Sequence, residues 1–103
     1  MVVFVNKVSV IGNAGDFERV YGHIADHLRT RPGLLRYQLL RSQKDPLTYF
    51  NVAEWETKEL FDAAMADPEF RARLKKLEGL IKGDPHVADV VDHGVVAAEG
   101  SSR

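Results

Sequence analysis

Hydrophobic and polar residues follow two different periods along this chain, and the changes of period divide it into strands and helices. Residues 2–11, 34–41 and 48–55 alternate with the period of two that is typical of β-strands. In the second of these segments, Leu35, Tyr37 and Leu39 are expected to share one face. Between the first two strands, apolar residues recur every three or four positions, which predicts an amphipathic helix. Its apolar stripe consists of Phe17, Val20, Tyr21, Ile24 and Leu28.

Capping residues predict where the helices begin and end. Asp16 is expected to cap the first helix, and the pair Pro32–Gly33 ends it. Thr57 is expected to cap a second helix. The pair Asp67–Pro68 restarts it, because an N-cap residue followed by proline is typical of a helix start. The apolar stripe of this second helical region consists of Leu60, Phe61, Ala64, Met65, Phe70, Leu74, Leu77 and Ile81.

The remaining residues predict a fourth strand from His86 to about Val96, followed by a disordered tail at 97–103. Residues 1–96 are therefore expected to form one domain. The order βαββαβ is that of the ferredoxin-like α+β fold, in which both helices cover one face of an antiparallel sheet. Val3 and Val5 place apolar side chains on the other face, which a second copy of the chain is expected to cover. We therefore predict a homodimer packed sheet to sheet, a dimeric α/β barrel.

The composition excludes several classes of function. The chain of 103 residues has a formal net charge of −1, so it offers no overall field to hold nucleic acid or an anionic membrane. It contains no cysteine, which excludes a disulfide framework and a thiolate nucleophile. No apolar run approaches the roughly 20 residues that span a bilayer, and the first residues do not follow the pattern of a signal peptide. A cytoplasmic protein is expected.

Metal and nucleotide sites are not predicted either. His23 and His27 have the i, i+4 spacing of helical metal ligands, but no third ligand with suitable spacing follows, and a solvated or half-exposed helix face explains them better. The chain has no glycine-rich phosphate loop and no nucleophile elbow. A solvated face is also expected for the charged residues of the second helical region. These are Glu69, Arg71, Arg73, Lys75, Lys76 and Glu78.

Two asparagines on apolar strand faces are the main functional signal. Asn51 shares a face with Tyr49 and Trp55, and Asn6 shares a face of the first strand with Phe4. Buried asparagines often only bond neighbouring backbone groups, and a buried tryptophan often only fills space. In a ferredoxin-like sheet, however, the first and third strands are adjacent at the centre. Both amides would then face the helices beside an indole, where neutral donors could orient a carbonyl or phenolic oxygen and stabilise an enolate.

The origin of a general base stays open at this stage. An asparagine amide cannot accept a proton at ordinary pH, so any proton removal would need the substrate, water or another residue. Arg36 and Tyr37 are two candidates that the sequence does not rank.

These residues resemble the antibiotic biosynthesis monooxygenase family, and within it the cofactor-independent anthrone oxygenases of aromatic polyketide pathways. The resemblance runs from about Val3 to Leu80. It rests on the segments 4–6, 31–34, 39–41 and 49–55. It implies a dimeric ferredoxin-like protein that converts an anthrone to an anthraquinone with O2 and uses neither a metal nor a flavin.

The resemblance also implies an active site made of Asn6, Asn51 and Trp55. On this hypothesis the two amides hold the oxygens of the substrate and favour its deprotonated form, which passes an electron to O2 directly. Trp55 shapes the pocket, stacks on the rings or assists with the oxygen species. The expected substrate-binding residues are Phe4, Tyr37 and Tyr49.

Two other functions stay open. The superfamily also contains haem-degrading monooxygenases, which share the asparagine of the first strand. Where these proteins have their haem-ligating histidine and a tryptophan, this chain has Leu74 and Ala64, and no histidine occurs between His27 and His86. The third possibility is a dimer that binds or senses a small molecule without converting it.

Overall fold

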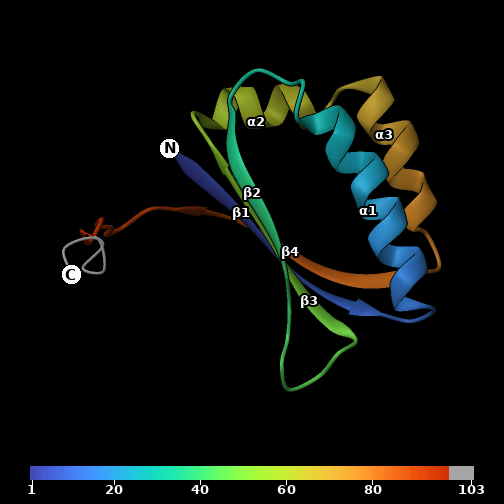
Figure 1. The fold of residues 1–103 in the computed structure, drawn as a ribbon. Helices are drawn as coiled ribbons and strands as arrows, with labels where there is room; N and C mark the ends of the chain where they lie inside the picture. The colour runs from blue at the N-terminus through green and yellow to red at the C-terminus, as the bar shows by residue number, and fades with distance from the viewer. Residues whose placement is uncertain (98–103) are drawn as a thin grey trace.

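A four-stranded antiparallel sheet carries all the helices on one of its faces in the computed structural model, which describes residues 1–97 (Figure 1). The strands are β1 (Val2–Val10), β2 (Leu34–Arg41), β3 (Thr48–Trp55) and β4 (Ile81–Asp89), in the order β2-β3-β1-β4. The helices are α1 (Ala14–Leu28), α2 (Lys58–Met65) and α3 (Pro68–Leu74), followed by a 3₁₀ turn, η1 (Lys75–Leu77). The expected ferredoxin-like α+β fold is confirmed. None of the described helices is long and apolar enough to cross a membrane.

Strands β1 and β3 are the central pair, as the sequence predicted, and their register decides where the asparagines lie. Val2 is opposite Trp55, Val8 is opposite Tyr49, and Asn6 is opposite Asn51 midway between them. Because successive side chains of a strand alternate between the two faces, all three pairs face the helices.

The core consists of two hydrophobic clusters, one toward each end of this strand pair. One cluster is built on Val2, Ala53, Trp55, Phe61 and Ala64. The other is built on Val8, Val10, Phe17 and Tyr49. The two asparagines therefore lie between the clusters, where the packing is interrupted.

Helix α1 begins three residues earlier than the sequence predicted. Its N-cap is Asn13, whose side-chain oxygen accepts a hydrogen bond of 3.0 Å from the backbone N–H of Asp16. The expected cap at Asp16 is wrong, because Asn13 satisfies the free N–H of the first turn and leaves Asp16 inside the helix. There its negative charge favours the positive end of the helix dipole.

Strand β4 runs from Ile81 to Asp89, so the expected strand from His86 to Val96 is misplaced. Gly79 adopts a φ of 82° after η1, which turns the chain out of the helical region and into the sheet. From there β4 pairs with β1 as far as Val2 opposite Asp89. It ends because β1 has no further residue to pair with. Of the expected tail at 97–103, residues 98–103 lie outside the described residues.

The start of β2 contains a β-bulge that changes the faces of its first residues. Leu34 is opposite Trp55 and Arg36 is opposite Glu54, so Leu35 is the additional residue. As a result Leu34 packs with Tyr37 against the core, while Leu35 is 51% exposed. The prediction that Leu35 shares the face of Tyr37 is therefore wrong.

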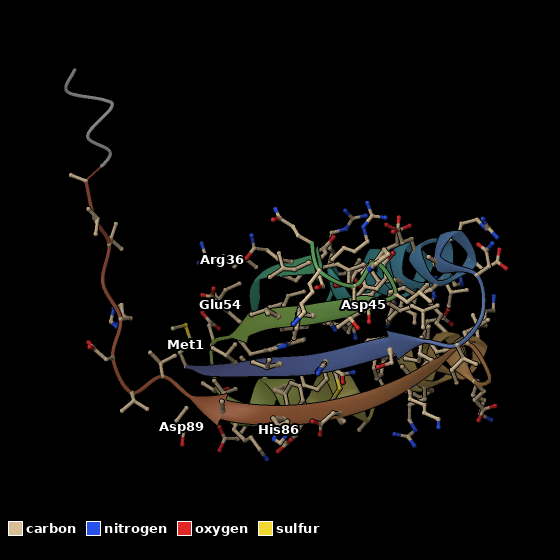
Figure 2. All side chains as sticks on the ribbon, turned by 90° about the horizontal axis from the view of Figure 1, so that it is seen from below. Met1, Arg36, Asp45, Glu54, His86 and Asp89 are labelled. Carbon is tan, nitrogen blue, oxygen red and sulfur yellow. The ribbon has the colours of Figure 1, made fainter. Side chains whose placement is uncertain are left out.

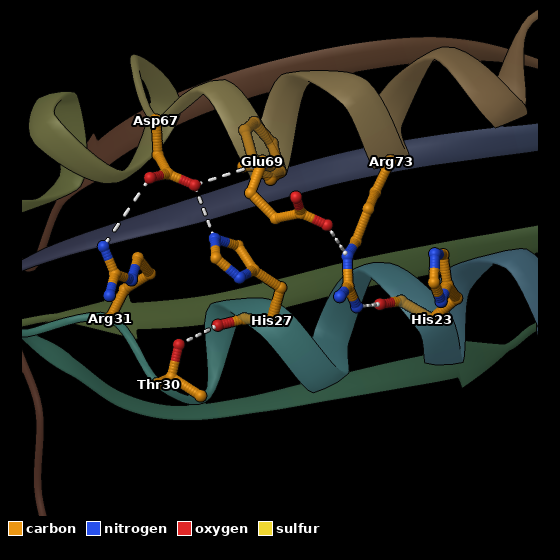
Figure 3. Close-up of polar contacts among 8 residues, drawn as sticks. His23, His27, Thr30, Arg31, Asp67, Glu69 and Arg73 are labelled. Atoms are coloured by element: carbon orange, nitrogen blue, oxygen red, sulfur yellow. Dashed lines mark hydrogen bonds and ion pairs between the residues drawn. The ribbon is translucent and has the colours of Figure 1, made fainter.

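Polar contacts join the C-terminal half of α1 to α3 (Figure 3). His27 Nε2 lies 2.5 Å from Asp67 Oδ2, and Arg73 Nη1 donates to the backbone oxygen of His23 at 2.6 Å. The backbone N–H of Phe70, followed by His27, holds the pKa of Asp67 below its usual value. His27 is half-buried and forms a contact between helices, while His23 is exposed. Within residues 1–97, no three His, Cys, Asp or Glu side chains gather as a metal site would require.

Gly33 is the position of the fold at which a larger residue is expected to cost most. It has a φ of 94°, and an added Cβ would lie 2.7 Å from the Cβ of Leu60 on α2. We expect Gly33→Ala to lower the free energy of unfolding by about 2–4 kcal/mol, because backbone strain and a steric clash add. Urea denaturation measures this loss.

Gly79→Ala is the matched control for this substitution. Gly79 also has a positive φ, but an added Cβ would meet no atom within 4 Å. Backbone strain alone is expected to cost about 1 kcal/mol there. Equal losses at the two glycines would contradict the close packing of Leu60 on Gly33.

Candidate active site

A cavity of about 340 Å³ lies between the sheet and the helices, in the gap between the two core clusters. This volume lies within the range of pockets that bind small molecules. Most of the lining is apolar or aromatic. Its polar side chains among the described residues are Asn6, Tyr21, Tyr37, Asn51, Trp55 and Arg71.

Five of the six site residues predicted from the sequence line this cavity: Phe4, Asn6, Tyr37, Asn51 and Trp55. They come from three strands, β1, β2 and β3. Phe4 also stacks on Phe61 of α2, with 5.7 Å between the ring centroids. The sheet therefore brings together most of the residues that the sequence proposed.

Tyr49 does not line the cavity, although it lies on the expected face of β3. It is 2% exposed, and its ring packs 4.9 Å from that of Phe17. Its hydroxyl donates to Glu18 Oε2 at 2.5 Å. The structure thus places Tyr49 in the core cluster behind the cavity.

Arg36, one candidate for a general base, lies on the other face of the sheet. It is opposite Glu54 on β3, and its Nε donates to Glu54 Oε2 at 2.5 Å. The two side chains lie together at one end of the sheet (Figure 2). Arg36 therefore has no access to the cavity of its own chain.

The amide of Asn6 has a fixed orientation, because its oxygen accepts a hydrogen bond of 2.8 Å from the backbone N–H of Asp84 on β4. Gly83 makes this approach possible, since an added Cβ there would lie 3.1 Å from Asn6 Oδ1. With the oxygen turned to β4, the NH2 group is left for other partners.

The amide of Asn51 is oriented in the same way by a different donor. Tyr21, on α1, donates its hydroxyl proton to Asn51 Oδ1 at 2.9 Å. Among the described residues, neither Asn6 Nδ2 nor Asn51 Nδ2 donates a hydrogen bond to the protein, and neither is a buried atom without a partner. Two NH2 groups on opposite residues of the central strands are therefore available as donors at the cavity.

Tyr21 is a site residue that the sequence reasoning missed, because it was counted only as part of the apolar stripe of the first helix. The one feature of the sequence that could have identified it is the hydroxyl that Tyr21 adds to an otherwise apolar stripe. Burial, assisted by the nearby Tyr37, raises the pKa of Tyr21 to about 12. The phenol therefore stays protonated at neutral pH and keeps its hydrogen bond to Asn51.

This pKa predicts a step near pH 12 in the spectrophotometric titration of the three tyrosines, in which burial also raises the pKa of Tyr49. We expect one tyrosine to ionise near pH 12, and this step to disappear in Tyr21→Phe. In Tyr37→Phe the step should stay above pH 10, because burial is the larger cause of the shift. A Tyr21 that ionises at its ordinary value of 10.0 would contradict the buried environment.

The same shift fixes the sign of a stability change at high pH. The folded protein keeps the Tyr21 proton while the unfolded chain loses it, so stability falls as pH rises from 10 to about 12. The difference in unfolding free energy between wild type and Tyr21→Phe should shrink over this interval.

Leu74 lines the cavity, and Ala64 is buried in the core cluster of Trp55 and Phe61. Within the described part of the chain, no histidine lines the cavity, and its one sulfur ligand is the thioether of Met65. The described lining therefore offers no imidazole to a haem iron.

The sequence has relatives of two kinds. It is 34% identical over 79 residues to the deoxynogalonate monooxygenase of Streptomyces nogalater. The match covers 77% of this chain and 67% of that protein. It is also 38% identical over 72 residues to the mycobilin-producing heme oxygenase of Mycobacterium tuberculosis, which covers 69% of each chain.

Solved structures share the fold. SnoaB, a cofactor-independent oxygenase from Streptomyces nogalater, superposes with a TM-score of 0.86 at 29% identity and covers 89% of this chain and 94% of its own. A proposed antibiotic biosynthesis monooxygenase from Deinococcus radiodurans superposes with a TM-score of 0.79, and at 17% identity it shows the fold alone.

The sequence pattern of one family, antibiotic biosynthesis monooxygenase, matches residues 1–76. This range includes β1, both central asparagines and Trp55. Together with the monooxygenase relatives, it supports an oxidoreductase that uses O2. The chain belongs to the antibiotic biosynthesis monooxygenase family.

Proposed function

We propose that the protein is a cofactor-independent monooxygenase that oxidises a phenolic, anthrone-like polycyclic substrate to a quinone with O2. The observation that carries this proposal is the pair of oriented amides, Asn6 and Asn51. Both amide oxygens are occupied by protein donors, so both NH2 groups can donate to an oxygen of a bound ligand. The relatives with oxygenase activity support the same chemistry.

The two amides would act on the charge that develops on the substrate. Hydrogen bonds to its carbonyl or phenolic oxygen favour the enolate form, since donors stabilise a charged oxygen more than a neutral one. No carboxylate or imidazole lines the cavity among residues 1–97, and Tyr21 stays protonated. The proton at the reacting carbon would then pass to water or to Tyr37, the candidate base that lines the cavity, from a substrate that the amides have made more acidic.

The electron-rich enolate then supplies the electrons for O2. It transfers one electron to O2, and the two radicals combine at the reacting carbon to form a peroxide anion, which takes a proton from water. Loss of water from this hydroperoxide leaves the quinone, so one oxygen atom becomes the new carbonyl oxygen and the other leaves as water. Trp55 and Phe4 would hold the flat ring system in place in the apolar cavity.

Oxygen uptake with an anthrone tests this function. Metal-free protein in air should consume O2 and produce quinone absorbance faster than the anthrone does by itself in buffer. Uptake no faster than in the buffer control would overturn the proposal.

Haem binding is the alternative that the comparison with the heme oxygenase favours. A Soret band on titration with hemin would support it, and the lack of a histidine in the described cavity lining opposes it. A dimer that binds without turnover would instead show thermal stabilisation by the anthrone and no oxygen uptake.

The homodimer and the cytoplasmic location stay predictions. In support of the dimer, the sheet face without helices carries apolar side chains that are only half-buried in the single chain: Val3, Val5, Phe50 and Val52. We propose that a second copy packs on this face. A monomeric mass by light scattering at micromolar concentration would overturn this.

A further inference from the structure

Arg71, on α3, is the one charged side chain in the cavity lining of the described residues. It is exposed, and its Nη1 donates to the backbone oxygen of Met65 at 3.4 Å. Since Met65 itself lines the cavity, the guanidinium lies at the boundary between the cavity and solvent. The sequence predicted only a solvated helix face at this position.

The pairing of the arginines sets Arg71 apart. Six of the seven arginines within residues 1–97 form ion pairs with carboxylates: Arg19, Arg29, Arg31, Arg36, Arg41 and Arg73. Arg73, two residues along the same helix, bonds Glu69 and the backbone of His23 (Figure 3). Arg71 has no carboxylate partner in this part of the chain. The unpaired guanidinium is the one that lines the cavity.

We propose that Arg71 binds a carboxylate of the aromatic ligand at the rim of the cavity, which makes the site selective for aromatic acids. A guanidinium suits this group because it donates two parallel hydrogen bonds to the two carboxylate oxygens. The other polar groups of the lining are neutral amides, phenols and an indole. Discrimination between an acid and its neutral ester therefore falls to Arg71. This inference rests on the proposed function in one respect, which is that the cavity binds a polycyclic aromatic ligand.

Binding of a matched pair of ligands tests the proposal. Anthraquinone-2-carboxylate and its methyl ester share the ring system and differ in charge. Their affinities can be followed by quenching of the fluorescence of Trp55, the single tryptophan, which lines the cavity. We expect wild type to prefer the acid by about tenfold, and this preference to fall with added salt. Arg71→Gln should remove the preference and leave the affinity for the ester within about twofold.

Lys75→Gln is the control variant. It removes the same charge four residues along the chain, at an exposed residue that does not line the cavity. It should therefore keep the preference for the acid. Equal affinities of wild type for acid and ester would overturn the proposal. So would equal losses for both ligands in Arg71→Gln, or a failure of either ligand to bind.

Oxygen uptake with an anthrone that lacks a carboxylate separates this proposal from the proposed function. If the acid is preferred but no oxygen is consumed, the oxygenase function fails and the role of Arg71 stands. If oxygen is consumed but acid and ester bind alike, the role of Arg71 fails and the oxygenase function stands.

Discussion

Asn51→Ala is expected to lower kcat for anthrone oxygenation about 100- to 1,000-fold, the usual loss when one donor to a developing oxyanion is removed. Asn51 is the cavity residue whose orientation is set from the helix layer, through the hydroxyl of Tyr21. The alanine variant removes the donor at the point where charge develops on the substrate. Steady-state oxygen uptake at saturating anthrone measures this loss.

Tyr21→Phe distinguishes the loss of the Asn51 amide donor from a change in the surroundings of that amide. It breaks the same hydrogen bond of 2.9 Å but keeps the amide of Asn51. We expect a loss of kcat below about tenfold, because the amide is less well oriented but still present. If Tyr21→Phe were as slow as Asn51→Ala, the direct role of the Asn51 amide would be contradicted.

Trp55→Ala is expected to lower the free energy of unfolding by about 3–5 kcal/mol, which is a large part of the roughly 5–15 kcal/mol available to a domain of this size. Trp55 is 1% exposed, and its ring meets that of Phe61 edge to face at 5.7 Å. The alanine would leave a void beneath α2. Urea denaturation followed by circular dichroism measures the loss, since the variant has no tryptophan fluorescence.

Trp55→Phe is the corresponding control. A phenyl ring refills part of the space, so we expect a loss of no more than about 2 kcal/mol. This variant stays folded, and its oxygen uptake reports the contribution of the indole to turnover. A loss below about 1 kcal/mol in Trp55→Ala would show that the ring is not packed between the sheet and α2 as described.

The fold was predictable because its main determinants are local. The periods of two and of three to four residues identify the first three strands and the two helical regions, and the order βαββαβ leaves few arrangements of the sheet. The order alone also brings Asn6 and Asn51 to adjacent strands. Their direct opposition depends on register, which no local pattern specifies. The position of β4 was missed for the same reason, because its length is set by pairing with β1.

The site was predictable in part, since a strand pattern gives the face of a residue but not its surroundings. Tyr49 lies on the predicted face and is nevertheless covered by Phe17. Tyr21 and Arg71 come from helices whose distance from the asparagines depends on how the layers pack. Leu34 and Leu35 were placed by a bulge that interrupts the strand period. Each of these results depends on tertiary contacts between segments far apart in the sequence.

Asp84 and Tyr21 occupy the oxygens of the two amides, so the amides present only hydrogen-bond donors to the cavity. Neither amide can rotate to offer its oxygen without breaking a hydrogen bond to the protein. The strand side of the cavity therefore favours ligands that present hydrogen-bond acceptors over ligands that present donors. An aromatic amine of the same shape as an anthrone would bring its N–H groups against the N–H groups of the two amides. We expect such nitrogen analogues to bind weakly. This selectivity depends on the backbone N–H of Asp84 and the hydroxyl of Tyr21, which contact the two asparagines and not the reacting atoms of the substrate.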